Sequence, residues 1–588
     1  MRDIFPVPQR VTWGDPETRV AATLASVRDA RLPAQGYELA ADEDGVRLGY
    51  ADEAGRRYGE QTLAQLRADD GTLPAVHIRD WPDVAVRGFM LDISRDRVPT
   101  PETLARLVAV LALARYNHLQ LYVEHAYAYA GHEDAWRDAS PVTADDLHWL
   151  DGRCASEGIE LVVNQNCFGH MGRWLALDRY RDRAECPQGV EPIKGLRLPA
   201  SVLEPTDANA RFALDLVREQ MAEVRSRRVN IGCDETFELG RGRSAARAAE
   251  VGVVGVYLEH IRRIAGPLID EGCAVLMWGD VIAHHPERVA ELPGGDLTAL
   301  VWNYDAPGAP IPEIPAPLAE VLAEIGIDLA SPTDFASRVA PFQDSGVPFW
   351  VAPGTSSWNS LVGRWDNARA NLLDAARVAA TSGAGGYLVT DWGDNGHHQP
   401  PSVSDVPIVY GGAVGWCAAT NADLDVAAVV DRLVYDDPTG TIGRVIETVG
   451  QVGSRTGRMA RNLSPLFSAL FPHQAHLVSG TPDPADISEV IATLDQARTE
   501  LAAAAPRASD GATVVEELDV AIGLARHGAI RLGASVGLGD LGPATMHADL
   551  AELIDRYRGA WSKRSRPGGL ADSVSHLERT LRTYEIDA

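Results

Sequence analysis

The chain has 588 residues, of which 45% are hydrophobic and 23% are charged, and its formal net charge is −28. This length predicts two or three domains with a large core, and the composition is typical of a folded globular protein. The strong negative charge argues against nucleic acid and anionic membrane surfaces as partners, because both would be repelled. Solubility is a sufficient reason for such a charge.

The amino-terminal segment and the cysteines bear on where the protein works. Residues 1–9 contain no continuous apolar segment that a secretion machinery would use, and no later run has the length of a membrane span. The six cysteines lack Cys-x-x-Cys spacing, which predicts free buried thiols. Together these features predict a reducing cytoplasm, although a chain trimmed of its leader would look the same.

Residues 1–80 have the pattern of a small α/β domain. Apolar and polar residues alternate over 37–40 and 45–50, around a turn at Asp42-Glu-Asp-Gly45, which predicts a β-hairpin. Helical spacing follows over 57–66. No chemistry is expected in this domain.

Residues 81–415 show apolar segments that alternate with helical segments. The breaker Trp81-Pro-Asp83 opens this part, and Thr100 and Thr143 are expected to cap two of its helices, while a third is expected over 207–227. The expected strands are 87–92, 118–123, 159–164, one starting at Val229, 274–278, 298–302, 349–352 and 386–390. Eight such repeats predict a (β/α)₈ TIM barrel of the α/β class, with its site at the carboxyl ends of the strands.

Residues 416–588 are rich in Ala and Leu with helical spacing, as in 425–434 and 514–524, and Pro- and Gly-containing breaks separate the helices. We expect a helical carboxyl-terminal region that packs against the barrel or against a second subunit, so a homodimer is one of two expected arrangements. It carries no catalytic signature.

Two adjacent acids, Asp234 and Glu235, stand where the strand that starts at Val229 meets a loop. An isolated pair of this kind is more often a solvated loop. The phrase Val229-Asn-Ile-Gly-Cys-Asp-Glu, however, resembles the Gly-x-Asp-Glu motif of family 20 glycoside hydrolases, the β-N-acetylhexosaminidases, and Tyr58-Gly-Glu-Gln-Thr-Leu-Ala-Gln-Leu66 is similar to a phrase of that family's amino-terminal accessory domain. The resemblance covers about residues 35 to 415.

The resemblance implies a retaining exo-hydrolase that removes a terminal β-linked GlcNAc or GalNAc. In that family the Glu is the general acid/base and the substrate's own 2-acetamido oxygen is the nucleophile, which the Asp orients. Carried over, Glu235 is the acid/base and Asp234 orients the acetamido group. Glycosidic cleavage needs such an acid together with a group that stabilises the positive charge developing on the sugar ring.

Two further positions match the family around its catalytic pair. Arg87 opens an Arg-Gly-x-x-x-Asp-x-x-Arg phrase, and the resemblance implies that it binds ring hydroxyls; a structural ion pair is the alternative, and Arg95 is assigned a structural role. His170 stands where the family has Pro-Gly-His and would couple Glu235 to an acid after the second strand, Glu124. A buried structural histidine is the alternative reading of His170.

Aromatic residues gather at the expected strand ends. Trp278, Trp302 and Trp392 are predicted to wall a sugar pocket, because a pyranose ring has an apolar face. Asp394 matches the acid of the family's Trp-Gly-Glu phrase, which binds outer sugar hydroxyls. The family's tyrosine after the seventh strand is missing, and the residues that could replace it are Trp358, Asn359 and Tyr304.

Three other functions were weighed. The pairs His284-His285 and His397-His398, with Asp280, Asp391 and Asp394, would suit a zinc hydrolase, but adjacent histidines point in divergent directions, so neither a metal nor another cofactor is expected. The second is a barrel glycosidase of drifted specificity that acts on another hexoside. The third is a sugar-binding protein without turnover, against which the intact Asp-Glu pair argues.

Overall fold

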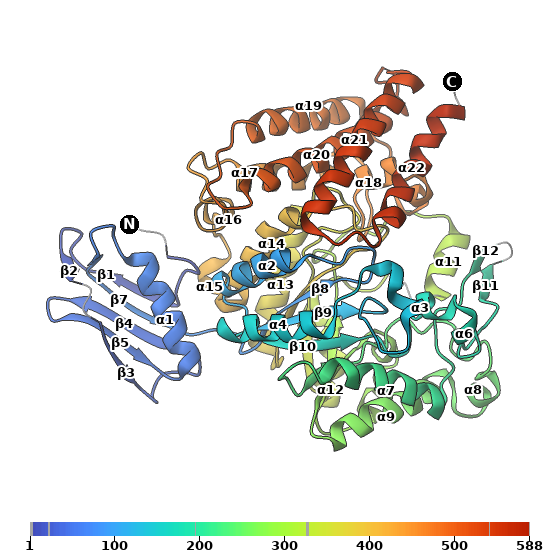
Figure 1. The fold of residues 1–588 in the computed structure, drawn as a ribbon, viewed down its shortest axis with the longest axis horizontal. Helices are drawn as coiled ribbons and strands as arrows, with labels where there is room; N and C mark the ends of the chain where they lie inside the picture. The colour runs from blue at the N-terminus through green and yellow to red at the C-terminus, as the bar shows by residue number, and fades with distance from the viewer. Residues whose placement is uncertain (1–3, 22–23, 194–195, 325–328, 540, 587–588) are drawn as a thin grey trace.

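The computed structural model describes residues 4–21, 24–193, 196–324, 329–539 and 541–586. Figure 1 shows a central barrel with an amino-terminal sheet on one side and a bundle of carboxyl-terminal helices on another. A small amino-terminal domain and a closed barrel of eight parallel strands are both present, so the predicted fold class is confirmed.

The amino-terminal region is a five-stranded sheet, in the order β1-β7-β4-β5-β3, with a helix packed on it. The predicted hairpin is confirmed, since β4 and β5 pair from Tyr37↔Tyr50 to Asp42↔Gly45. The helix begins earlier than predicted because Asp52 caps it by accepting a hydrogen bond from the Gly55 N–H. The elements are β1 Arg10–Trp13, β2 Arg19–Ala21, β3 Leu24–Arg28, β4 Tyr37–Asp42, β5 Gly45–Tyr50, α1 Glu53–Leu66, β6 Thr72–Pro74 and β7 Val76–Asp80.

The barrel strands follow the predicted segments closely. Four have the predicted bounds, and the others differ by a residue or so at their ends. They are β8 Arg87–Asp92, β9 His118–Val123, β10 Glu160–Gln165, β13 Arg228–Asn230, β14 Ala274–Trp278, β15 Leu297–Trp302, β16 Phe349–Ala352 and β17 Tyr387–Asp391. Each strand pairs in parallel with its neighbours, and β17 closes the ring on β8. A barrel of this kind gathers all eight carboxyl ends at one face.

The helices around the barrel have the predicted caps. Thr100 and Thr143 accept hydrogen bonds from the backbone of the first turns of α2 and α4. The helix predicted over 207–227 ends at Met221, so that boundary was wrong: the Ser226 hydroxyl bonds the Arg228 N–H, and this local contact competes with the helix. The helices are α2 Pro101–Leu113, α3 Glu133–Trp136, α4 Ala144–Ser156, α5 Gly172–Leu175, α6 Asp178–Arg181, α7 Asp207–Met221, α8 Ala245–Val251, α9 Val253–Asp270, α10 Asp280–Ala283, α11 Ala316–Glu324, α12 Phe335–Ser345 and α13 Trp365–Ser382; β11 Val190–Ile193 and β12 Leu196–Leu198 form a hairpin.

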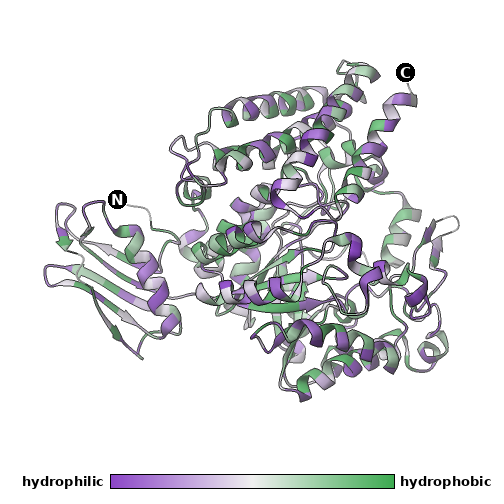
Figure 2. Ribbon diagram, in the orientation of Figure 1, coloured by the Kyte–Doolittle hydropathy of each residue, from purple (hydrophilic) through white to green (hydrophobic). Residues whose placement is uncertain are grey.

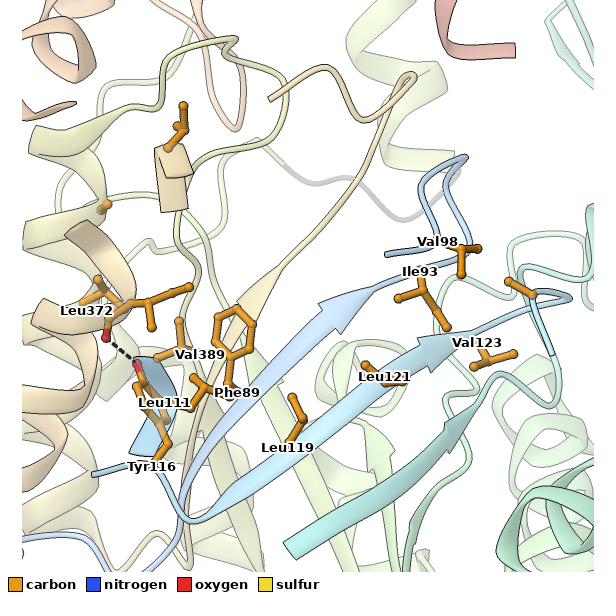
Figure 3. Close-up of a cluster of buried hydrophobic side chains, with 14 of the residues drawn as sticks. Phe89, Ile93, Val98, Leu111, Tyr116, Leu119, Leu121, Val123, Leu372 and Val389 are labelled. Atoms are coloured by element: carbon orange, nitrogen blue, oxygen red, sulfur yellow. Dashed lines mark hydrogen bonds between the residues drawn. The ribbon is translucent and has the colours of Figure 1, made fainter. Parts of the chain in front are cut away.

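The main core lies between the barrel strands and the helices outside them. Figure 2 shows mostly hydrophobic strands surrounded by helices with mixed faces. In Figure 3, Phe89 and Val389 of neighbouring strands pack toward Leu111 and Leu372 of two outer helices. Burying one such side chain contributes about 1.5–3 kcal/mol. A polar group in this layer is hydrogen-bonded as well: the Tyr116 hydroxyl donates to the Ile408 carbonyl at 2.9 Å.

The carboxyl-terminal region is helical, as predicted, and packs against the barrel. Contacts between the two include Arg106 to Asp510 at 2.6 Å and His398 Nε2 to the Ser573 carbonyl at 3.1 Å. The helix that follows the last barrel strand, α14 Asp405–Trp416, packs against α2 and α13. The helices of the carboxyl-terminal region are α15 Ala418–Asn421, α16 Val426–Val430, α17 Ile442–Gln451, α18 Pro465–Leu470, α19 Pro484–Leu501, α20 Gly511–Ala534, α21 Pro543–Arg564 and α22 Leu570–Ile586. No helix in the described ranges has both the length and the apolarity to cross a bilayer. All six cysteines are buried with free thiols, as predicted.

Candidate active site

Five polar side chains meet where the first four barrel strands end. Arg95 follows β8, Glu124 follows β9, His170 follows β10, and Asp234 and Glu235 follow β13. The carboxyl ends of parallel strands share one face of the barrel, so residues far apart in sequence become neighbours there.

His170 lies at the centre of this cluster. Its Nε2 atom is 3.1 Å from Asp234 Oδ2 and 3.3 Å from Glu235 Oε2, and its Nδ1 atom is 3.8 Å from Glu124 Oε1. The Asn166 amide also donates to Asp234 Oδ1 at 2.7 Å. The structure thus brings together the four residues that the motif analysis grouped.

The two adjacent acids have different surroundings. The Asp234 side chain is 10% exposed and the Glu235 side chain 42% exposed. Burial opposes ionisation of Asp234, but the charge and hydrogen bond of His170 lower the pKa of Asp234 below its ordinary value. For His170, burial favours the neutral ring, but the Asp234 and Glu235 carboxylates raise its pKa well above the ordinary value. The result is a buried carboxylate beside an accessible one, as acid and base chemistry at one site requires.

Arg95 lies inside the cluster, so the purely structural role predicted for it does not describe its position fully. Its guanidinium is 3.0 Å from Asp92, 3.5 Å from Glu124 and 3.6 Å from Asp394. It also lies 4.9 Å from the ring centres of Tyr122 and Trp392. Burial raises the pKa of Asp394 to about 6, although Arg95 acts in the opposite direction.

The prediction that Arg87 binds the sugar was wrong. Arg87 is the first residue of β8 and is fully buried at the amino end of the barrel. It donates to the carbonyls of Val84, Ala85 and Arg115 and to the side chains of Gln35 and Tyr58. A strand rises about 3.3 Å per residue, so roughly 17 Å separate Arg87 from the carboxyl end of its own strand. Arg87 instead ties the amino-terminal domain to the barrel.

Asp280, two residues beyond β14, supports the loop that carries Glu235. Its Oδ2 atom accepts a hydrogen bond from the Glu235 N–H at 3.2 Å. Burial and the nearby Asp234 charge raise the pKa of Asp280 to about 7. Perturbed carboxyls of this kind concentrate at functional sites.

The backbone around the cluster is strained. His170, Cys233 and Glu235 have φ values of 54°, 70° and 48°, in the left-handed region that costs non-glycine residues about 1–3 kcal/mol each. Gly169 is needed for a close approach, because a Cβ atom there would lie 2.2 Å from the Asp234 carbonyl oxygen. The fold thus accepts local strain in order to hold His170 against the two acids.

Five aromatic side chains lie together beside the cluster: the three tryptophans predicted to wall a sugar pocket, and Tyr304 and Trp358. Tyr304 reaches across from β15: it stacks on Trp302, meets the Trp358 ring edge-on at 5.1 Å, and accepts a hydrogen bond from Trp392 Nε1 at 2.9 Å. Trp278 lies 5.7 Å from Trp392 between ring centres. Tyr304 and Trp358, two of the residues considered as replacements for the family's tyrosine, are therefore in contact with each other.

A cavity of about 400 Å³ opens beside these rings. Glu235, Asp280, Trp302 and Tyr304 line it on the barrel side, and residues from Arg461 to Leu477 of the carboxyl-terminal region line it on the other. Such a volume is ordinary for a small-molecule site. The helical region, which carries no catalytic motif, thus contributes directly to the surroundings of Glu235.

In the described part of the chain, no group of three or more His, Cys, Asp or Glu side chains has the arrangement of a metal site. His398 packs against Phe471 and bonds the Ser573 carbonyl, and burial lowers the pKa of both His397 and His398. Asp391 accepts a hydrogen bond from the Thr355 hydroxyl at 2.7 Å. His398 thus helps to pack the carboxyl-terminal region on the barrel, whereas Asp391 is bonded within the barrel.

Several residues of the site escaped the sequence analysis. Arg95 had a usable signal, because it follows the end of a strand whereas Arg87 begins it. Asn166 stands inside the phrase that was singled out for His170, and Asp280 was weighed only as a metal ligand. Arg461, Asn462 and Gln474 had no signal, since they come from a region without motifs.

Comparisons with known proteins identify relatives of this chain. Residues 3–81 match the family model described as "Glycosyl hydrolase family 20, domain 2". A β-hexosaminidase of Akkermansia muciniphila is 25% identical over 189 residues, which cover 28% of this chain and 38% of that protein. The matched part therefore spans less than half the length of this curated relative. The predicted resemblance to family 20 is confirmed.

Solved structures share the fold. A β-N-acetylhexosaminidase from Bacteroides fragilis has a TM-score of 0.52 and 15% identity, and the match covers 71% of this chain and 91% of that one. A chitobiase from Flavobacterium johnsoniae has a TM-score of 0.52 and 13% identity, with 98% of each chain covered. At these identities the likeness supports the arrangement of the elements.

Proposed function

We propose that this relative of the family 20 glycoside hydrolases is an exo-acting, retaining β-N-acetylhexosaminidase that removes terminal β-linked GlcNAc or GalNAc. One observation carries the proposal: a buried Asp234 and a half-exposed Glu235 both lie within 3.3 Å of the same nitrogen of His170, at the carboxyl ends of the strands. A site with two carboxyls in contrasting surroundings is what glycosidic cleavage needs.

In the proposed reaction, Glu235 donates its proton to the glycosidic oxygen as the C1–O bond breaks. The 2-acetamido oxygen of the same sugar forms a bond to C1 and gives a cyclic oxazolinium ion. The Asp234 carboxylate accepts the hydrogen bond of the acetamido N–H and stabilises the positive charge. Glu235, now ionised, takes a proton from a water molecule that attacks C1 from the vacated side. The bond between C1 and the acetamido oxygen breaks in this step, so the acetamido group is restored and the sugar is released with its configuration retained.

The remaining residues have roles that follow from their positions. Arg95 and Asp394 form a charged pair that can bind vicinal hydroxyls of the terminal sugar, the role first assigned to Arg87. Trp302 and Trp392 offer apolar faces for the sugar ring, and the fully buried Trp278 packs beside Trp392. Tyr304 or Trp358 takes the place of the family's tyrosine beside the acetamido group.

A barrel glycosidase of drifted specificity is the second candidate. The observation that favours it is the loop after β16, where Trp358 stands and the family's tyrosine does not. Cleavage of β-glucosides or β-galactosides in preference to N-acetylhexosaminides would identify this alternative.

The cytoplasm is the proposed location, supported by six free buried thiols.

Hydrolysis of a panel of p-nitrophenyl glycosides by the full chain tests the proposal. We expect release of p-nitrophenol from β-GlcNAc or β-GalNAc, and inhibition by a thiazoline that imitates the cyclic intermediate. The β-glucoside, which has no acetamido group, should react far more slowly. A folded protein that cleaves none of these substrates would favour the sugar-binding alternative, and thiazoline-insensitive cleavage would contradict the acetamido mechanism.

A further inference from the structure

The cavity of about 400 Å³ has a particular relation to the catalytic pair. Glu235 lines it, whereas Asp234, His170, Arg95 and Asp394 are not among the described residues of its wall. A general acid touches the oxygen that joins the terminal sugar to the rest of the substrate. Trp302 and Tyr304, which are also assigned to the terminal sugar, line the cavity as well. A space that the acid and these two rings reach, but that the charged residues assigned to the terminal sugar do not, is therefore where the rest of the substrate would lie.

A chain of side-chain amides crosses one wall of this cavity. Gln474 Nε2 donates to Asn395 Oδ1 at 3.1 Å, Asn395 Nδ2 donates to Asn359 Oδ1 at 2.9 Å, and Asn359 Nδ2 donates to the Asn462 carbonyl at 3.4 Å. All four residues line the cavity. Two of these residues belong to barrel loops and two to the carboxyl-terminal region. Their hydrogen bonds therefore join the two regions at the wall of the cavity.

Arg461 holds this wall in place. Its guanidinium donates to the backbone carbonyls of Ala309, Pro310, Leu329 and Ser331, which belong to the segment between β15 and α12. The Asn462 N–H also donates to Asp305 Oδ1 at 3.0 Å. Because Arg461 already serves these carbonyls, its role in the cavity is to fix the wall, not to bind an anion.

The chemistry of the wall selects a ligand class. Glu235, Asp280 and Asp305 contribute acids, and the amide chain contributes neutral groups that both donate and accept hydrogen bonds. Pro312, Leu463 and Leu477 add apolar surface. Arg338 and Arg461 lie in the same wall and offset the acids, so the wall carries no strong net charge. Amides for hydroxyls and apolar patches for ring faces then suit a neutral sugar.

We propose that this cavity binds the neutral sugar unit next to the scissile bond, and that the carboxyl-terminal region, through Gln474, determines specificity for that unit. The inference deepens the proposed function and rests on it. Gln474 acts on the leaving portion of the substrate, away from the reacting atoms. The enzyme would then prefer oligosaccharides of neutral sugars over glycosides with a small aglycone.

Two substrates that share a terminal GlcNAc test this inference. The full chain and its Gln474→Ala variant are compared on N,N′-diacetylchitobiose and on p-nitrophenyl β-GlcNAc, whose aglycone has no hydroxyl groups. We expect kcat/KM for the disaccharide to fall about five- to tenfold through KM, the worth of one or two hydrogen bonds, and the aryl substrate to lose less than about twofold. Gln496→Ala, on the exposed face of α19, is the matched control and should change neither value.

The outcomes separate the two proposals. If the wild type cleaves neither substrate, the proposed function fails. If it cleaves both and Gln474→Ala changes them equally or not at all, the subsite is wrong while the proposed function stands. Gln474→Leu keeps the side-chain volume and removes the amide, so it serves if the Ala variant does not fold, and thermal melting of each variant verifies folding. A stronger loss on the aryl glycoside than on the disaccharide would also overturn the inference.

Discussion

The two ends of the barrel use arginine in opposite ways. At the amino end, Arg87 is fully buried and bonded to three carbonyls and two neutral side chains, while Arg115 pairs with Asp80 at 2.8 Å. At the carboxyl end, Arg95 is partly exposed and faces Asp92, Glu124 and Asp394. One end completes its hydrogen bonds within the protein, and the other concentrates charge at an opening.

The titrating groups show the same contrast, because the raised pKa values of Asp280 and Asp394 are found at the carboxyl end. Left-handed non-glycine residues occur at both ends, as Arg115 at the amino end and His170 and Glu235 at the carboxyl end show. Strain and perturbed carboxyls lower stability unless something compensates, and the satisfied network at the amino end provides stability elsewhere. The barrel therefore separates the residues that hold the domains together from those that act on substrate.

Glu235→Gln should have the largest effect of these substitutions, and it should reduce activity without reducing stability. We expect kcat for p-nitrophenyl β-GlcNAc to drop by about 10²- to 10⁴-fold, because the amide cannot give up a proton. The melting temperature should hardly change, since the Glu235 side chain is 42% exposed. Glu238→Gln is the control: this buried acid of the same loop bonds Ser201, so its loss should cost stability more than chemistry. Wild-type turnover by Glu235→Gln would remove Glu235 from the mechanism.

Arg95→Ala and Arg87→Ala compare the two ends directly. Losing hydrogen bonds from a charged donor to the sugar should lower kcat/KM of the Arg95 variant by about 10- to 100-fold. The Arg87 variant leaves buried carbonyls unpaired and should lose about 3 kcal/mol of unfolding free energy while keeping most of its activity. Kinetics and urea unfolding of both variants check this, and the reverse pattern would restore the original assignment of Arg87.

His170→Gln should change how stability depends on pH. The pKa of His170 is raised in the folded state, so its stabilisation is fully present below the unfolded value of about 6.5 and is lost as pH rises through the folded value. The free energy of unfolding should therefore be higher for the wild type than for the variant, and this difference should be largest near pH 6. The difference in unfolding free energy should become smaller toward alkaline pH. Urea titrations at several pH values measure it, and a gap that widens with pH would contradict the pairing with Asp234.

Tyr58→Phe should have the smallest effect. It removes one hydrogen bond to Arg87, of 2.9 Å, at the amino end and should cost about 1 kcal/mol of stability. Hydrolysis of p-nitrophenyl β-GlcNAc should stay at the wild-type level, because Tyr58 lies in the amino-terminal domain. Thermal melting with a kinetic assay tests both, and lost activity in a fully stable variant would mean that the two ends are coupled.

The barrel was predictable because its signals are local. Strands such as 349–352 are continuous apolar runs, and helices such as the one capped by Thr100 begin at residues with strong capping preference. The grouping of Asp234, Glu235 and His170 could be predicted because all three follow strands. Gln474 and Arg461 could not, since tertiary packing alone brings the helical region to the cavity. Arg87 was misassigned because the motif contains two arginines, and only the second, Arg95, follows the end of the strand.

Thiazoline binding tests the central claim that the carboxyl-end cluster recognises an N-acetylhexosaminide through its acetamido group. Calorimetric titration of the folded wild type should show one binding site per chain. Asp234→Asn should weaken that binding by about 10-fold or more, the worth of a hydrogen bond to a charged group, and Arg87→Ala should leave it largely intact. Equal binding by the wild type and Asp234→Asn, or none by the folded wild type, would contradict the account.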